Sequence, residues 1–116
     1  MFVGDYAPFS EIFPRARIVI HHGGIGTTGQ ALRAGLPQLV VPLFADQFDN
    51  AARVVRLGVA RSVGLKRYRA DRAAAELSAL LGEESYHARA VAVGREVSQE
   101  DGSEVAVQVV ESITRL

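Results

Sequence analysis

Two histidines and four glycines stand together in the segment VIHHGGIGTTGQAL, positions 19 to 32. The segment joins a β-branched apolar run to an amphipathic stretch, so we expect a strand, a tight turn and the start of a helix. The first N–H groups of a helix have no partner within it and lie at the positive end of its dipole, which suits phosphate. Gly23, Gly24 and Gly26 would let an anion approach the backbone closely, and Thr27 would add a hydroxyl group. This pattern predicts a phosphate-binding turn.

Two other interpretations of the turn stay open at this point. The glycines could form a tight turn and nothing more, with Thr27 as a structural helix cap. Positions 24 to 29 also match G-x-G-x-x-G, the dinucleotide fingerprint, with Asp46 as its ribose-binding acid. In that fingerprint the acid ends the second strand, whereas here Pro42 and the residues after it separate Asp46 from the apolar run. One of the two histidines is expected to be structural, because neighbours on a strand face opposite sides.

Strands and helices must alternate to position these residues. Short apolar runs predict strands at 17–20, 38–43 and 59–63, and the stretches between them predict helices at about 27–34 and 49–57. Gly35 and Gly58 are typical helix stops, and Asp46 or Asp49 is available as the cap of the second helix. This order predicts a parallel sheet with right-handed crossovers.

The remaining segments extend this half-sheet at both ends. The opening residues 1–4 would add a further strand, and alanine- and leucine-rich stretches predict helices at 71–81, 84–100 and 102–116, with Asp71 and Ser103 as caps of the first and last. We therefore predict an α/β fold, a Rossmann-like three-layer parallel sheet that forms a C-terminal half-domain and is followed by helices. Its incomplete sheet edge would favour self-association as a homo-oligomer.

Composition narrows the class of protein further. The 116 residues carry 13 basic and 13 acidic side chains, so no long-range field attracts nucleic acid. There is no cysteine, which excludes disulfides and thiolate metal sites. The longest apolar run, LVVPLFA, is far shorter than the ~20 residues that span a bilayer. No signal peptide is evident, so a cytoplasmic protein without a membrane span is expected.

Positions 6 to 60, YAPFSEIFPRARIVIHHGGIGTTGQALRAGLPQLVVPLFADQFDNAARVVRLGVA, resemble the donor-binding signature of family 1 glycosyltransferases, whose GT-B fold has two facing Rossmann-like domains. The resemblance is closest to the bacterial macrolide, sterol and rhamnosyl transferases, in which HHGGxGT, AGxPQLVxP and DQxxNA occur in this order. It implies a domain that binds a nucleotide sugar such as a UDP- or dTDP-hexose.

The resemblance also implies a role for each matching residue. His22 falls where the family's histidine contacts the diphosphate, and Gly24, Gly26 and Thr27 fall in the turn that supplies the other phosphate contacts. The pair Asp46 and Gln47 falls where the hydroxyls of the transferred sugar are bound. A carboxylate and an amide together can recognise several hydroxyl groups.

Near the nucleoside, Phe9 and Gln30 depart from the family's pattern, whereas Tyr6 keeps an aromatic ring at its position. Tyr6 stands where many relatives stack a tryptophan on the base, and a tyrosine ring could serve. Phe9 replaces a glutamine that contacts the base. Gln30 stands where a glutamate holds the ribose, and its amide oxygen can still accept a hydrogen bond.

The resemblance implies inverting catalysis without a metal or other cofactor. No third ligand accompanies the His21–His22 or Asp46–Asp49 pairs. The general base would come from an N-terminal acceptor domain, so we expect residues 1–116 to be a partial donor-binding domain without catalytic residues of its own, inactive alone. His87 is expected at the surface. The alternatives are a non-catalytic module that binds nucleotide sugars and needs a separate acceptor domain, and, remotely, an NAD(P)-dependent oxidoreductase.

Overall fold

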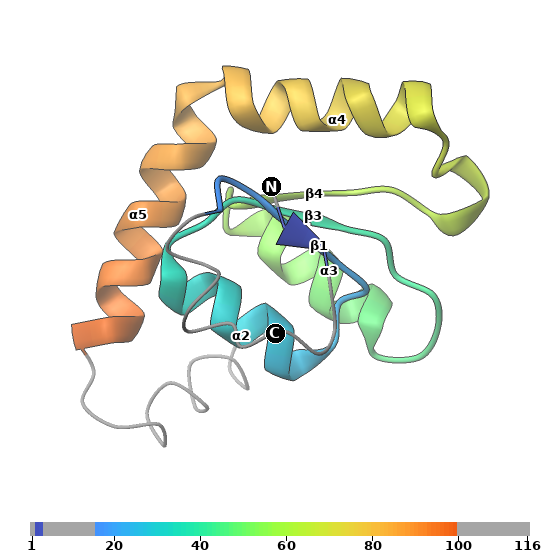
Figure 1. Cartoon of the computed structure of the whole chain (residues 1–116). Helices are drawn as coiled ribbons and strands as arrows, with labels where there is room; N and C mark the ends of the chain where they lie inside the picture. The colour runs from blue at the N-terminus through green and yellow to red at the C-terminus, as the bar shows by residue number, and fades with distance from the viewer. Residues whose placement is uncertain (1, 4–15, 100–116) are drawn as a thin grey trace.

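Four parallel strands form one sheet in the computed structural model, which describes residues 2–3 and 16–99 (Figure 1). The strands are β1 (Phe2–Val3), β2 (Val19–His21), β3 (Gln38–Val40) and β4 (Ala60–Ser62). They lie in the order β1-β2-β3-β4, with Ile20 paired to Leu39 and Leu39 paired to Arg61. The predicted parallel sheet is confirmed, and the opening residues supply its fourth strand.

The strands are shorter than the apolar runs predicted. The second predicted strand extended to residue 43, whereas β3 ends at Val40. Val41 still donates its N–H to the carbonyl of His21 at 2.8 Å. Pro42 has no N–H to donate, which explains why the ladder stops there.

Helices follow β2, β3 and β4 in the predicted order. They are α2 (Ile25–Ala34), α3 (Gln47–Arg56), α4 (Ala70–Gly82) and α5 (Glu84–Gln99), with a 3₁₀ turn, η2 (Leu65–Arg67), before α4. Gly35 has φ 71° and Gly58 has φ 79°, left-handed values that end α2 and the turn after α3. Both predicted stops are therefore confirmed. The predictions for Tyr6, Phe9, Ser103 and the helix at 102–116 lie outside the described residues.

Two of the predicted helix caps are wrong, because α2 and α4 begin earlier than their sequence signals indicated, whereas the cap position predicted at Asp46 is confirmed. Gly24 is the N-cap of α2, so Thr27 lies within the first turn. Asp46 occupies the N-cap position of α3 but makes no capping hydrogen bond, and Asp49 lies inside the helix. Asp71 lies in the first turn of α4, whose N-cap is Arg69.

Helices cover both faces of the sheet, as a three-layer fold requires. Figure 1 shows α2 and α3 below the strands, α4 above them and α5 descending along one side. Leu39 and Val41 pack in the cluster that contains Leu80 of α4, whereas Val40 packs with residues of α2, α3 and α5. Alternate residues of one buried strand therefore serve opposite layers.

Two glycines bring α5 directly against the end of α2. A Cβ atom at Gly94 would lie 2.7 Å from the Cα of Gly35 and 3.0 Å from the carbonyl oxygen of Leu32. No side chain fits in that space, so the close approach of the two helices depends on glycine.

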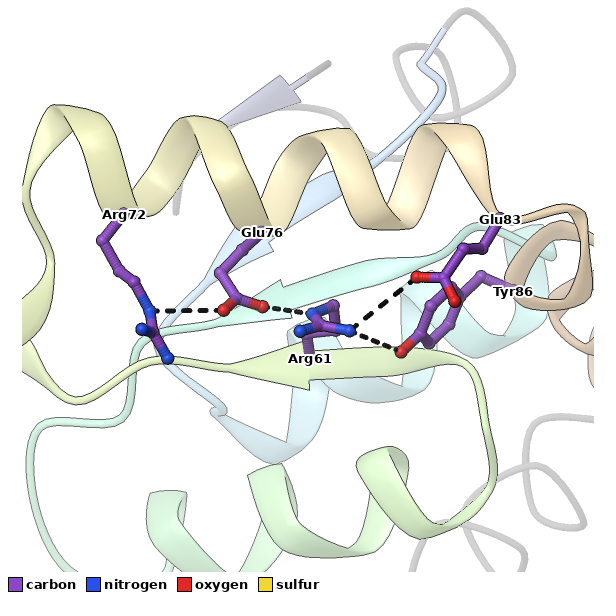
Figure 2. A network of polar contacts seen from close by, with 5 residues as sticks. All are labelled: Arg61, Arg72, Glu76, Glu83 and Tyr86. Carbon is purple, nitrogen blue, oxygen red and sulfur yellow. Dashed lines mark hydrogen bonds and ion pairs between the residues drawn. The ribbon is translucent and has the colours of Figure 1, made fainter.

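A polar network fastens α4 over the sheet (Figure 2). Arg61 of β4 forms an ion pair with the buried carboxylate of Glu76 in α4 and donates to the hydroxyl of Tyr86 in α5 at 3.0 Å. Arg72 contacts the other oxygen of Glu76 at 3.3 Å, and Glu83 lies 4.0 Å from Arg61. The hydrogen bonds to Glu76 and Tyr86 raise the pKa of Arg61, so the guanidinium stays charged.

In the part of the chain that the structure describes, no helix is both long and apolar enough to cross a membrane. The longest helix among the described residues, α5, has an amphipathic sequence rather than a continuous apolar one.

Candidate functional site

Apart from Tyr6, which lies outside the described residues, the residues of the predicted site lie near the carboxyl edge of the sheet, where β2 and β3 end side by side. The glycine turn follows β2, and the loop at 41–46 follows β3. In Figure 1 the starts of α2 and α3 lie on the same side of the molecule, below this edge. In open parallel sheets, ligands bind at this edge.

The two histidines at the end of β2 lie in different environments. His21 is 4% exposed, and its Nε2 lies 2.6 Å from Oε1 of Gln38. Its Nδ1 accepts the backbone N–H of Gly23 at 3.0 Å, so Nε2 must carry the proton that Gln38 accepts. His22 is exposed at the surface. His21 therefore shapes the turn from within the core, and His22 is the histidine that a ligand at this edge can reach.

The three glycines of the turn differ in what they do. Gly23 has φ 94°, and a Cβ atom there would lie 2.9 Å from the carbonyl oxygen of Gln47 and 3.1 Å from a methyl of Val40. The fold itself thus requires this glycine, for which the sequence pattern had predicted a role in anion approach. Gly24 and Gly26 are exposed, and a Cβ atom at either position would have no neighbour within 4 Å. They leave the N-terminus of α2 open to a ligand.

The polar side chains of α2 are arranged along its first two turns. Thr28 is buried and donates its hydroxyl to the carbonyl of Gly24 at 2.7 Å. Thr27 is partly buried one position earlier, and Gln30 is exposed. Thr27 and Gln30 thus remain on the accessible side of the helix start.

Asp46 and Gln47 lie at the start of α3, with Asp46 exposed. Oε1 of Gln47 accepts the backbone N–H groups of Leu43 at 2.9 Å and Phe44 at 3.3 Å. Ala45, between Phe44 and Asp46, has φ 56°, an uncommon value for a residue with a side chain. The carbonyl end of Gln47 therefore holds the loop in shape, which leaves its NH₂ group as the end that can donate to a ligand.

Asn50 joins the two halves of the edge. It is 1% exposed, and its Nδ2 donates to the carbonyl of Gly23 at 2.7 Å. Neither Asn50 nor Gln38 was predicted as a site residue, although both are letters of the motifs DQxxNA and AGxPQLVxP. Their place in the two motifs could have indicated that Asn50 and Gln38 are buried and hydrogen-bonded to the loop and strand beside them.

Potential metal ligands are scattered over the described part of the chain. Within residues 2–3 and 16–99, no group of three or more His, Cys, Asp or Glu side chains is placed to hold a metal ion. The absence of a metal from the reaction stays a prediction. His87 is exposed on α5, as expected.

Known proteins resemble the chain over nearly its whole length. The model of the family described as Erythromycin biosynthesis protein CIII-like, C-terminal domain, matches residues 2–112. An O-mycaminosyltylonolide 6-deoxyallosyltransferase of Streptomyces fradiae is 42% identical over 106 residues, which are 90% of this chain and 25% of that protein. The chain thus spans about a quarter of the length of this relative.

Two solved structures have the same fold. The glycosyltransferase VinC, in complex with dTDP, is 30% identical and has a TM-score of 0.77, with 97% of this chain and 28% of that chain covered. The spinosyn rhamnosyltransferase SpnG, complexed with thymidine diphosphate, is 27% identical with a TM-score of 0.72, covering 90% of this chain and 29% of that one.

A parallel α/β sheet with a glycine turn and a helix start at its carboxyl edge defines a Rossmann-like class of protein. Within this class, the chain belongs to the family of C-terminal domains of family 1 glycosyltransferases, which have the GT-B fold.

Proposed function

We propose that this chain binds the diphosphate and the sugar of a UDP- or dTDP-hexose, as the donor side of an inverting, metal-independent glycosyltransferase. One observation carries the proposal. The hydrogen bond from Asn50 to Gly23 fixes the start of α3 against the glycine turn. The candidate sugar-binding residues, Asp46 and Gln47, therefore lie at the same edge of the sheet as the candidate diphosphate-binding turn. The dTDP complexes of VinC and SpnG support a nucleotide diphosphate as ligand.

The diphosphate would bind at the start of α2. His22 would donate a hydrogen bond, and the open backbone at Gly24 and Gly26 would present the unpaired N–H groups of the first turn. The hydroxyl of Thr27 would add a further donor. As the glycosidic bond to the donor breaks, negative charge grows on the leaving diphosphate, and donors already in place stabilise it.

The hexose would bind between Asp46 and Gln47. The carboxylate of Asp46 accepts from sugar hydroxyls, and the NH₂ group of Gln47 donates to a sugar oxygen, since its Oε1 is occupied by the loop backbone. The nucleoside would lie beyond the diphosphate, with its ribose at Gln30 and its base on Tyr6, which lies outside the described residues.

The reaction would proceed by in-line displacement. The acceptor's hydroxyl oxygen forms a bond to the anomeric carbon as the bond from that carbon to the diphosphate oxygen breaks, which inverts the configuration. The hydroxyl proton passes to a general base. We assign that base to an acceptor domain rather than to this chain, so the chain by itself would bind the donor and not transfer the sugar.

Calorimetric titration of the chain with dTDP, UDP and NADH tests this function. We expect dTDP or UDP to bind and NADH not to bind. His22→Ala should weaken nucleotide binding about 10- to 100-fold, the range for loss of a hydrogen bond to a charged group. His87→Ala, which removes an exposed histidine from α5, is the matched control and should bind as the parent does. NADH binding without dTDP or UDP binding would overturn the proposal, and unchanged affinity of His22→Ala would remove that residue from the site.

A further inference from the structure

Both backbone polar groups of Gly23 are held inside the molecule. Its N–H donates to Nδ1 of His21 at 3.0 Å, and its carbonyl oxygen accepts a hydrogen bond from Nδ2 of Asn50 at 2.7 Å. Both contacts are buried, and the φ of 94° at Gly23 is one that glycine adopts without strain. The polar groups of this residue therefore point into the core and not toward a ligand.

The contact with Asn50 also fixes the direction of the next N–H group. The carbonyl of Gly23 and the N–H of Gly24 belong to one planar trans peptide, in which the two groups point in opposite directions. Since Asn50 holds the carbonyl in the core, the N–H of Gly24 points the other way. Gly24 is exposed, and a Cβ atom there would have no neighbour within 4 Å. Among the described residues no group accepts this N–H, which therefore faces open space.

This donor continues the row of unpaired N–H groups at the start of α2. The first hydrogen bond within that helix runs from the N–H of Thr28 to the carbonyl of Gly24 at 2.9 Å. The N–H groups of residues 25 to 27 precede it and have no carbonyl to bind within the helix. Together with Gly24, four successive N–H groups are available at this helix start.

The peptide between the two glycines could also take the reverse orientation. Its rotation changes ψ of Gly23 and φ of Gly24, and neither residue has a Cβ atom that would oppose the change. A reversed peptide would place the carbonyl oxygen of Gly23 where the N–H of Gly24 stands, and that oxygen would repel an anion. In the described part of the chain, Asn50 supplies the side chain that binds this carbonyl, so it decides between the two orientations.

We propose that Asn50 is a positioning residue for the donor's diphosphate, because it holds the Gly23 carbonyl in the core and so points the Gly24 N–H at the anion. The inference rests on the proposed function. Asn50 is 1% exposed, so it acts through this peptide and not by touching the nucleotide. A donor that is already oriented needs no rearrangement when charge develops on the leaving diphosphate.

Nitrogen-15 and phosphorus-31 NMR of the full chain with dTDP tests the proposal, with UDP as the probe if the chain binds only that nucleotide. We expect a scalar coupling between the Gly24 nitrogen and a phosphorus nucleus, which is transmitted across an N–H···O–P hydrogen bond. Asn50→Asp keeps the shape of the side chain and removes its N–H donor. It should abolish this coupling and weaken nucleotide binding about 10- to 100-fold, the range for loss of a hydrogen bond to a charged group.

Two further variants accompany this measurement. Asn50→Ala should act as Asn50→Asp does, without introducing a buried charge. Glu76→Gln is the matched control, because it alters a buried polar group of α4, away from the glycine turn. It should leave both the coupling and the nucleotide affinity unchanged.

Each other outcome has a defined meaning. Nucleotide binding by the parent chain without this coupling would overturn the inference and leave the proposed function standing, and that measurement requires no variant to fold. A coupling that persists in the two Asn50 variants would leave Asn50 as a tie between the loops, and unchanged affinity would remove it from the site. Either result also overturns the inference. A parent chain that binds neither dTDP nor UDP would overturn the proposed function and this inference with it.

Discussion

The side-chain amide of Asn50 lies 2.7 Å from the carbonyl oxygen of Gly23, and this hydrogen bond joins the first turn of α3 to the glycine turn before α2. The two residues are 27 positions apart in the sequence, in loops that follow the paired strands β2 and β3. Because Asn50 is buried, the bond is shielded from water and its donor has no solvent to replace the partner. This hydrogen bond therefore ties the two loops of the proposed donor site together.

Asn50→Ala is expected to lower the free energy of unfolding by about 1–3 kcal/mol, because the Gly23 carbonyl loses its buried donor. It should also weaken dTDP binding, since the two loops lose their tie. Urea denaturation measures the first effect and calorimetry the second. Arg56→Ala, an exposed substitution on the same helix, should stay within about 0.5 kcal/mol of the parent. Equal stability of Asn50→Ala and the parent would contradict the role given to this bond.

Gly23→Ala and Gly24→Ala separate folding from binding at neighbouring positions. At Gly23 the new methyl meets a backbone oxygen 2.9 Å away at φ 94°, so we expect a loss of more than about 1 kcal/mol. Gly24 has φ −63° and ψ 144° with open space around it, and the stability of Gly24→Ala should change by less than about 0.5 kcal/mol. Its methyl would still stand where the diphosphate is proposed to bind, so dTDP affinity should fall. Denaturation and calorimetry on the same two samples check both expectations.

The order of strands and helices was predictable because its signals are local. Runs such as RIVI and QLVV favour buried strands, and Gly35 and Gly58 ended their segments as predicted. The start of α2 was not predictable in this way, because it depends on the extended conformation of Gly24, which the surrounding structure determines. The contact between Asn50 and Gly23 exists only once β2 and β3 pair, and the sequence carries no periodic trace of it. Motif resemblance supplied the candidate site residues, and the packing shows which of them hold the turn and the loop in shape.

His21→Ala and His22→Ala should affect different properties, although the residues are adjacent: the first should lower stability and the second should weaken ligand binding. Loss of the buried His21 imidazole leaves a cavity and removes the partner of both the Gly23 N–H and Gln38, which should cost about 2–4 kcal/mol of unfolding free energy. His22 is exposed, so its replacement should leave stability within about 0.5 kcal/mol and act on ligand binding instead. Thermal unfolding followed by circular dichroism distinguishes the two. A stable His21→Ala variant would refute the buried role.

Glu76→Gln is expected to destabilise the fold by about 1–3 kcal/mol, since it removes the buried charge that holds Arg61 beneath α4. Glu83→Gln is the matched control. Its carboxylate lies 4.0 Å from Arg61 and is mostly exposed, so its loss should cost less than about 0.5 kcal/mol. For a domain of this size, 1 kcal/mol corresponds to roughly 4–8 °C in Tm. Equal melting temperatures for the two variants would show that the network contributes nothing specific.

The buried contact between His21 and Gln38 has a consequence for how the strands find their alignment. β2 and β3 pair over three residues, with Val19 opposite Gln38 and His21 opposite Val40. A slip of two positions would keep the apolar side chains on their own faces, so hydrophobicity alone discriminates weakly against it. A slip in the direction that moves His21 further from Gln38 would bury both side chains without a partner, at a cost that the native pairing avoids. The polar pair inside the core thus favours the native alignment of two very short strands over one of the slipped alignments that hydrophobicity alone would tolerate.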